Sequence, residues 1–126
     1  MQRQTKKTVK TSSVKEYFYK CITLTSSVMP EDMELTWKER EFLTECCYFN
    51  YNGGNLNNFA ELSDYLLGIR FFEKKSDVSV YKTKLSNSKW ITSKRGKFLL
   101  PKDLDIKKGE EHKMNFSIVI SYEHRG

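Results

Sequence analysis

The feature that most constrains the fold is a helix with marked start and stop signals in the first half of this 126-residue chain. The segment Thr36–Glu39 (TWKE) matches a capping box, in which the threonine hydroxyl and the glutamate carboxylate each accept a hydrogen bond from the other residue's backbone N–H. The predicted helix ends at Asn52–Gly54, where glycine adopts positive φ without a steric penalty. The remaining segments have to pack against this helix.

Two more helices are expected from caps and apolar spacing. Asn58 caps the first, which ends at Gly68, and Ser76 caps the second. Apolar residues at i, i+3 and i+7 mark one inward face on each helix. We expect these segments to share one buried cluster: Trp37, Phe42, Leu62, Leu66, Val78, Tyr81, Leu85 and Trp90.

Other segments are typical of strands. Val14–Ser26 is rich in aromatic and β-branched residues, and Met114–Glu123 alternates apolar and polar residues. Trp90–Thr92 and Lys97–Leu100 flank a tight turn at Ser93–Gly96 and predict a β-hairpin. The expected fold is α+β: a three-helix core with a hairpin wing and with N- and C-terminal strands. Residues 1–13 form a basic arm, and 14–126 a single domain.

That order of elements resembles a winged helix-turn-helix domain over about Leu35–Leu100. Asp77–Leu85 followed by Lys89–Ile91 is similar to the segment in which a recognition helix runs into the first wing strand. The lysine-rich composition, with Ala60 as the single alanine, also resembles small proteins of tailed bacteriophages, including the crAss-like group. The resemblance implies one of two uses, as a structural part of the head–tail connector or as a regulator.

Charge is unevenly distributed along the chain, whose net charge is +6. Eight lysines and arginines lie in Lys74–Lys97, where Asp77 is the one acidic residue. This stretch predicts a surface for phosphates or for an acidic partner, and a merely solvated lysine-rich surface is the alternative. The third predicted helix has no Arg, Asn or Gln before Asn87, which favours phosphate contacts over base contacts. The candidate nucleic-acid-binding residues are Ser79, Lys82, Thr83, Lys84, Ser86, Lys94, Arg95 and Lys97.

Nothing in the sequence indicates an enzyme. Phosphate-loop, nucleophile-elbow, zinc-protease and EF-hand patterns are absent, and Cys21, Cys46 and Cys47 form no C-x-x-C pair. We therefore expect no catalytic residue, no metal, no cofactor and no small-molecule substrate. Tyrosines in the first half suggest single-strand or RNA binding as an alternative, against the simpler interpretation that they belong to the core: Tyr17, Tyr19, Tyr48 and Tyr51.

The expected function is that of a non-enzymatic assembly protein of a phage particle, a head–tail connector or ring component. Its expected partners are other copies of itself, neighbouring virion proteins and double-stranded DNA, bound through phosphates. The polar, basic N-terminus is not a secretory signal, and no apolar run is long enough for a membrane span. We expect the protein in the virion and, during assembly, in the host cytoplasm. The alternative is a winged-helix transcriptional regulator.

Overall fold

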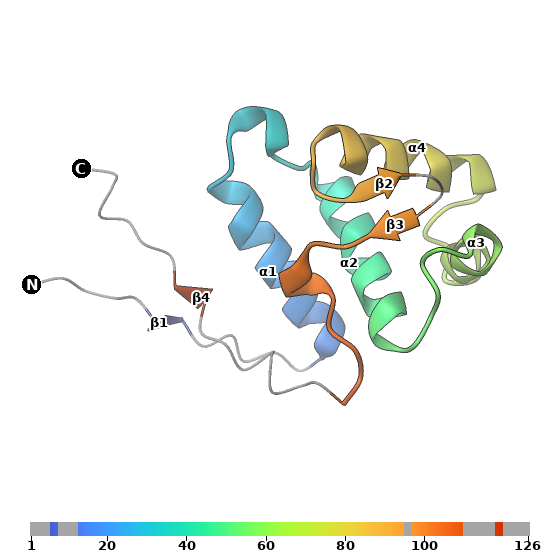
Figure 1. Cartoon of the computed structure of the whole chain (residues 1–126), viewed down its shortest axis with the longest axis horizontal. Helices are drawn as coiled ribbons and strands as arrows, with labels where there is room; N and C mark the ends of the chain where they lie inside the picture. Colours follow the sequence, from blue (N-terminus) through green and yellow to red (C-terminus); the bar gives the residue numbers. More distant parts are fainter. Residues whose placement is uncertain (1–5, 8–12, 95–96, 110–117, 120–126) are drawn as a thin grey trace, which may run out of the picture.

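In the described part of the chain, four α-helices make up the body of the protein (Figure 1). The computed structural model describes residues 6–7, 13–94, 97–109 and 118–119. Within these ranges no helix has the length and apolar character needed to cross a bilayer. The helices are α1 (Val14–Ser27), α2 (Trp37–Tyr51), α3 (Phe59–Gly68) and α4 (Lys75–Asn87). The other elements are the 3-10 turns η1 (Glu31–Met33) and η2 (Lys102–Leu104) and the short strands β1 (Lys6–Lys7), β2 (Thr92–Lys94), β3 (Lys97–Leu99) and β4 (Ile118–Val119).

The expected α+β fold is wrong, because the described chain is mainly helical. The predicted N-terminal strand is helix α1, which packs against α2. Ser13 caps this helix by accepting a hydrogen bond from the backbone N–H of Glu16 at 3.1 Å. Phe18 and Ile22, four residues apart, are buried, so the segment follows the helical period rather than the β preference of its residues.

The strands add no sheet layer to the helices, so a three-helix core with a wing is not the architecture. β2 and β3 pair antiparallel over three residues each and lie beside α4. β1 and β4 pair antiparallel over two residues each. Of the predicted C-terminal strand Met114–Glu123, the structure describes only Ile118–Val119, and most of the basic arm likewise lies outside the described residues.

The core lies where α1, α3 and α4 meet α2. Phe42 of α2 packs against three rings, with centroids 6.4 Å from Phe71, 5.7 Å from Phe72 and 5.7 Å from Tyr81. The predicted buried cluster is wrong for Trp37, whose side chain is 61% exposed. The other predicted members belong to the core, although Tyr81 is only partly buried. Five positions separate Trp37 from Phe42, which rotates the two side chains about 140° apart around the helix.

The start of α2 is confirmed, whereas the predicted start of α4 is wrong. Thr36 N–H donates to Glu39 Oε1 at 2.7 Å, and Glu39 N–H donates to Thr36 Oγ1 at 3.2 Å, which completes the capping box. Helix α4 begins at Lys75, one residue before the expected cap Ser76, and its N-cap residue Lys74 makes no side-chain cap bond. Charged residues thus begin this helix without the hydroxyl cap that the sequence suggests.

Helices α2, α3 and α4 end in the same Schellman geometry. The residue after each C-cap has positive φ: 91° at Gly53, 61° at Arg70 and 64° at Lys89. The 6→1 bond closes each turn; in α4 it runs from Trp90 N–H to the Leu85 carbonyl at 3.0 Å. After α3 and α4, the basic residues Arg70 and Lys89 therefore occupy a left-handed backbone conformation that only glycine adopts without strain.

Replacing Lys89 with glycine is expected to stabilise the protein by about 1 kcal/mol, because glycine adopts this left-handed conformation without a Cβ clash. Lys89→Ala is the matched control, since it removes the same charge and keeps the strain. Chemical denaturation of both variants measures the difference. Equal stabilities for the glycine and alanine variants would show that the backbone at Lys89 is unstrained.

Candidate nucleic-acid interface

Helix α4 presents an uncharged face to solvent. Val78 and Leu85 are fully buried on its inner side. On the opposite side Ser79 and Thr83 are exposed, and Val80 is 49% exposed. The Thr83 hydroxyl donates to the Ser79 carbonyl at 3.0 Å, so this hydroxyl is already engaged within the helix. The exposed face of α4 is thus polar, with hydroxyl groups and one aliphatic side chain.

Two predicted contact residues, Lys82 and Lys84, lie on opposite flanks of that face. The Lys82 ammonium lies 5.9 Å from the ring centroid of Phe59 and 5.5 Å from that of Phe98. The Lys84 ammonium lies 4.8 Å from the Tyr81 ring centroid. Two positions along a helix turn a side chain by about 200°, so the structure does not gather these lysines in one cluster. They border the exposed face, one on each side.

The β2–β3 ribbon carries a further exposed cation, Lys97. Phe98 of β3 is buried, whereas Lys97 next to it is exposed. Ser86 is half-buried at the end of α4. The side chain of Lys94 and all of Arg95 lie outside the described residues. Of the eight predicted contact residues, the structure therefore locates six, five of them on α4 and Lys97 on β3.

In the part of the chain that the structure describes, no carboxylate forms an ion pair with these lysines. Within the described residues, ion pairs join Lys15 to Glu45, Lys20 to Glu16 and Lys75 to Asp64, and none involves Lys82, Lys84, Lys89 or Lys97. Lys89, which was not among the predicted contact residues, is exposed directly after α4. Its place just beyond the predicted helix could be read from the sequence.

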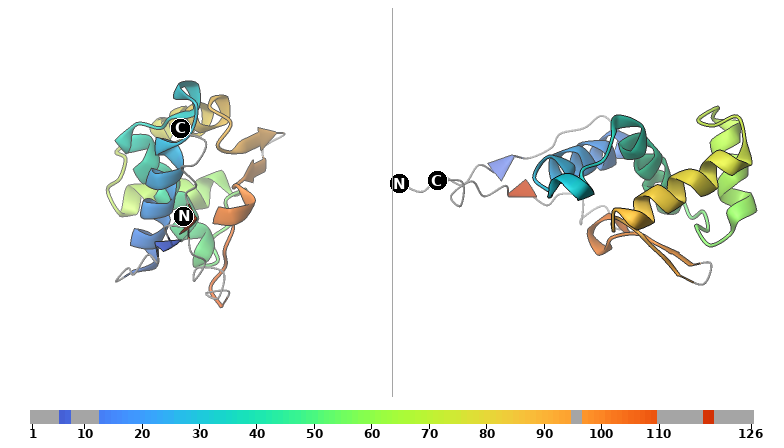
Figure 2. Two further views of the ribbon diagram at one scale, coloured as in Figure 1. Left: turned by 90° about the vertical axis from the view of Figure 1, so that its left-hand side faces the viewer. Right: turned by 90° about the horizontal axis from the view of Figure 1, so that it is seen from above.

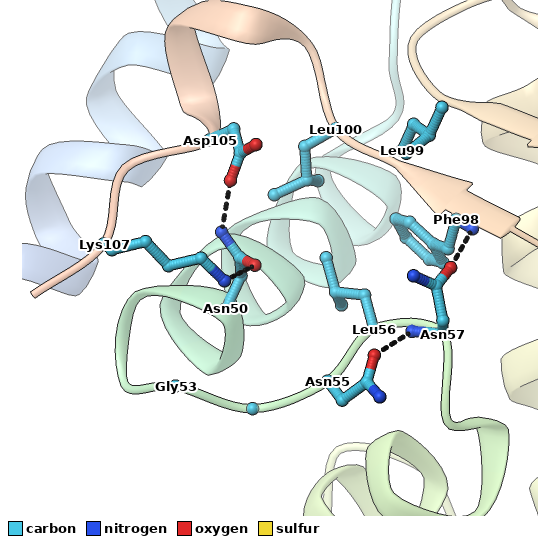
Figure 3. Close-up of a pocket in the computed structure, with 11 residues that line it drawn as sticks. Asn50, Gly53, Asn55, Leu56, Asn57, Phe98, Leu99, Leu100, Asp105 and Lys107 are labelled. Carbon is cyan, nitrogen blue, oxygen red and sulfur yellow. Dashed lines mark hydrogen bonds between the residues drawn. The ribbon is translucent and has the colours of Figure 1, made fainter.

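A pocket of about 360 Å³ lies beside the ribbon, between the α2–α3 loop, β3 and the segment that follows it (Figure 3). The buried amide of Asn50 donates from Nδ2 to Asp105 Oδ1 at 2.9 Å and accepts from Lys107 Nζ at 2.8 Å. The amide oxygen of Asn57 accepts from the backbone N–H of Phe98 at 2.8 Å. These amides connect the loop and the later segment to α2 and β3, so they hold the ribbon in place.

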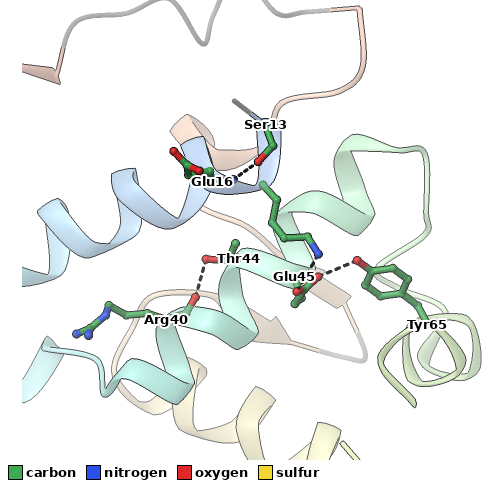
Figure 4. Close-up of polar contacts among 7 residues, drawn as sticks. Ser13, Glu16, Arg40, Thr44, Glu45 and Tyr65 are labelled. Carbon is green, nitrogen blue, oxygen red and sulfur yellow. Dashed lines mark hydrogen bonds and ion pairs between the residues drawn. The ribbon is translucent and has the colours of Figure 1, made fainter. Parts of the chain in front are cut away.

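A second hollow, of about 540 Å³, lies between α1, α2 and the link from α3 to α4. Beside it, Glu45 accepts a hydrogen bond from the Tyr65 hydroxyl at 2.8 Å and pairs with Lys15 at 3.2 Å (Figure 4). Burial, and then the hydrogen bond to Glu45, raise the pKa of the Tyr65 hydroxyl above its usual value. The Glu45 carboxylate of α2 therefore connects α2 to α1 through Lys15 and to α3 through Tyr65. This is a structural role for Glu45.

The cysteines and tyrosines of the first half belong mainly to the α1–α2 packing. Cys46 and Cys47 are fully buried, and burial raises the pKa of both thiols, which makes them poor nucleophiles. The described residues contain no group of three potential metal ligands; His112 and His124 lie outside them. Buried Tyr17 and Tyr51 each meet the ring of Phe18, so these two tyrosines are not free to stack on bases.

Comparison of the chain with protein-family models, with curated proteins and with solved structures gave no match. The resemblance to phage proteins stays a prediction from the sequence. Support for a function comes from the residues of this chain, and the cations around α4 provide the most specific arrangement among those described.

Proposed function

We propose that the protein is a non-enzymatic assembly protein that binds the phosphate backbone of double-stranded DNA through α4 and the β2–β3 ribbon. The observation that supports this is the placement of Lys82 and Lys84 on the two flanks of an uncharged, exposed helix face. No ion pair among the described residues involves either lysine. Phosphate binding requires cations that no carboxylate already holds. A phage particle, with other copies and neighbouring virion proteins as partners, is the setting that we propose from the composition.

The dimensions of a helix suit such a contact. An α-helix with its side chains is about 10–12 Å across, and the major groove of B-DNA is about 12 Å wide. With the Ser79–Thr83 face turned into the groove, Lys82 and Lys84 point toward the two sugar-phosphate backbones. Lysine neutralises phosphate as a point charge but discriminates poorly between bases. We therefore propose binding that depends on charge and is largely independent of DNA sequence.

Salt titration of the full chain with duplex DNA tests this function. Affinity is expected to fall steeply with salt, and Lys84→Gln and Lys97→Gln should each reduce the log–log slope by about 0.9, since each removes one phosphate contact. Lys20→Gln is the matched control, because Lys20 carries the same charge on α1, where it pairs with Glu16 at 2.9 Å. That variant should keep the slope of the parent protein.

Three results would contradict the proposal. Equal losses for Lys20→Gln and Lys84→Gln would show that net charge, not the α4 surface, drives binding. An absence of binding at low salt would leave the lysines as a solvated surface. A preference of about a thousandfold or more for one sequence over random DNA would instead favour a regulator.

A further inference from the structure

Phe98 of β3 connects the β2–β3 ribbon to the lysines of the proposed DNA-binding surface. Its ring is 2% exposed, and the Lys82 ammonium on α4 lies 5.5 Å from the ring centroid. Lys97, which is exposed, directly precedes Phe98 on the same strand. The position of Phe98 therefore determines where β3 presents Lys97, and its ring helps to direct the Lys82 side chain.

The ribbon cannot fix the position of Phe98 by its own pairing. β2 and β3 pair over three residues each, and an isolated two-stranded ribbon is at best marginally stable in water. In both views of Figure 2 the ribbon lies at the side of the helical body. Contacts with that body and its loops therefore have to hold the ribbon in place.

One such contact comes from Asn57 in the α2–α3 loop. Phe98 is paired with Ser93 of β2, and its backbone N–H donates to Asn57 Oδ1 at 2.8 Å (Figure 3). Antiparallel strands alternate between residue pairs that exchange both backbone hydrogen bonds and pairs that exchange none. The N–H of Phe98 thus points to the outer edge of β3, where the Asn57 amide takes the place that a third strand would have.

The Asn57 amide is presented by an ordered loop. The backbone N–H of Asn57 donates to Asn55 Oδ1 at 2.9 Å, which forms an Asx turn. Leu56 is buried, and the side chain of Asn58 caps α3. Because the residues on both sides of Asn57 are anchored, the loop directs the amide oxygen toward β3.

We propose that Asn57 is a positioning residue for DNA binding: its hydrogen bond to the Phe98 N–H holds the ribbon so that Lys97 reaches the sugar-phosphate backbone. In this role Asn57 acts through β3 and contacts no phosphate itself. The role rests on the proposed function, and it identifies the contact that sets the geometry of the lysine on the ribbon.

Salt titrations of a double-mutant cycle with duplex DNA test this role. Asn57→Ala should reduce the log–log slope by about 0.9, as Lys97→Gln does, because an unheld ribbon no longer keeps Lys97 at a phosphate. Adding Lys97→Gln to Asn57→Ala should cause no further reduction, since the two residues act as one unit. Asn52→Ala is the matched control: Asn52 is exposed at the C-cap of α2, at the start of the same loop, and this variant should keep the parent slope.

Amide hydrogen exchange of Phe98, measured by NMR on the full chain, follows the hydrogen bond without DNA. The Phe98 N–H should exchange slowly in the parent protein and faster in Asn57→Ala. Slow exchange should return in Asn57→Asp, because a carboxylate oxygen accepts the same hydrogen bond. Far-ultraviolet circular dichroism of each variant verifies that the helices are intact.

Three results would overturn the role of Asn57 and leave the proposed function standing. They are unchanged exchange of the Phe98 N–H in Asn57→Ala, a parent slope in Asn57→Ala, and slope losses for Asn57→Ala and Lys97→Gln that add in the double variant. A parent chain that binds no DNA even at low salt would instead overturn both proposals.

Discussion

Phe42→Ala is expected to lower the free energy of unfolding by about 3–5 kcal/mol, the usual cost of truncating a buried phenylalanine. Phe42 is fully buried, and its ring lies between the rings of Phe71, Phe72 and Tyr81. These neighbours come from the α3–α4 link and from α4, so the cavity would open between α2 and both elements. Urea denaturation followed by circular dichroism measures the loss.

Trp37→Ala is the matched comparison for that loss. The indole is larger than the phenyl ring but 61% exposed, so its removal should change stability by less than about 0.5 kcal/mol, as for other surface substitutions. If Trp37→Ala were as costly as Phe42→Ala, the assignment of the inner face of α2 would be wrong.

Gly54→Ala is expected to destabilise the protein by about 1–3 kcal/mol, the usual cost of overpacking a filled site. A Cβ at this position would lie 2.5 Å from two atoms of the Phe49 ring. That ring is buried and packs against Tyr65 with centroids 5.2 Å apart, so it has little freedom to move. Thermal and urea denaturation measure the change.

Gly68→Ala is the control for Gly54→Ala. A Cβ at Gly68, the last residue of α3, meets no atom within 4 Å. Alanine is the better helix former, so this variant should be neutral or stabilising by up to about 1 kcal/mol. Destabilisation by both alanines would indicate a general intolerance of the α2–α4 region rather than a clash with Phe49.

The sequence predicted a helix correctly where the signals for its start, its end and its buried face all indicated the same segment. The capping box at Thr36 and the cap at Asn58 are confirmed, and so is the burial of Leu62 and Leu66. Helix α1 was misassigned because its β-branched and aromatic residues outweighed two weaker signals. Those signals were the S-x-x-E pattern at Ser13 and the four-residue spacing of its buried side chains.

The candidate site was predictable in charge but not in geometry. Counting lysines located the basic stretch, yet only the three-dimensional arrangement shows Lys82 between two phenylalanine rings and Lys84 on the other flank of α4. The buried amide of Asn50, which links Asp105 and Lys107, joins residues more than fifty positions apart. Such long-range contacts leave no local pattern, because they depend on how the helices pack.

The pairing of β1 with β4 has a consequence for the order of folding. It joins Lys6–Lys7 to Ile118–Val119 across the whole helical body, so closing it costs more chain entropy than any helix contact within the body. Helices form from local contacts in microseconds, whereas distant pairings form late. During synthesis β1 is made well before β4. The helical body between them can therefore complete its core before the β1–β4 pair exists.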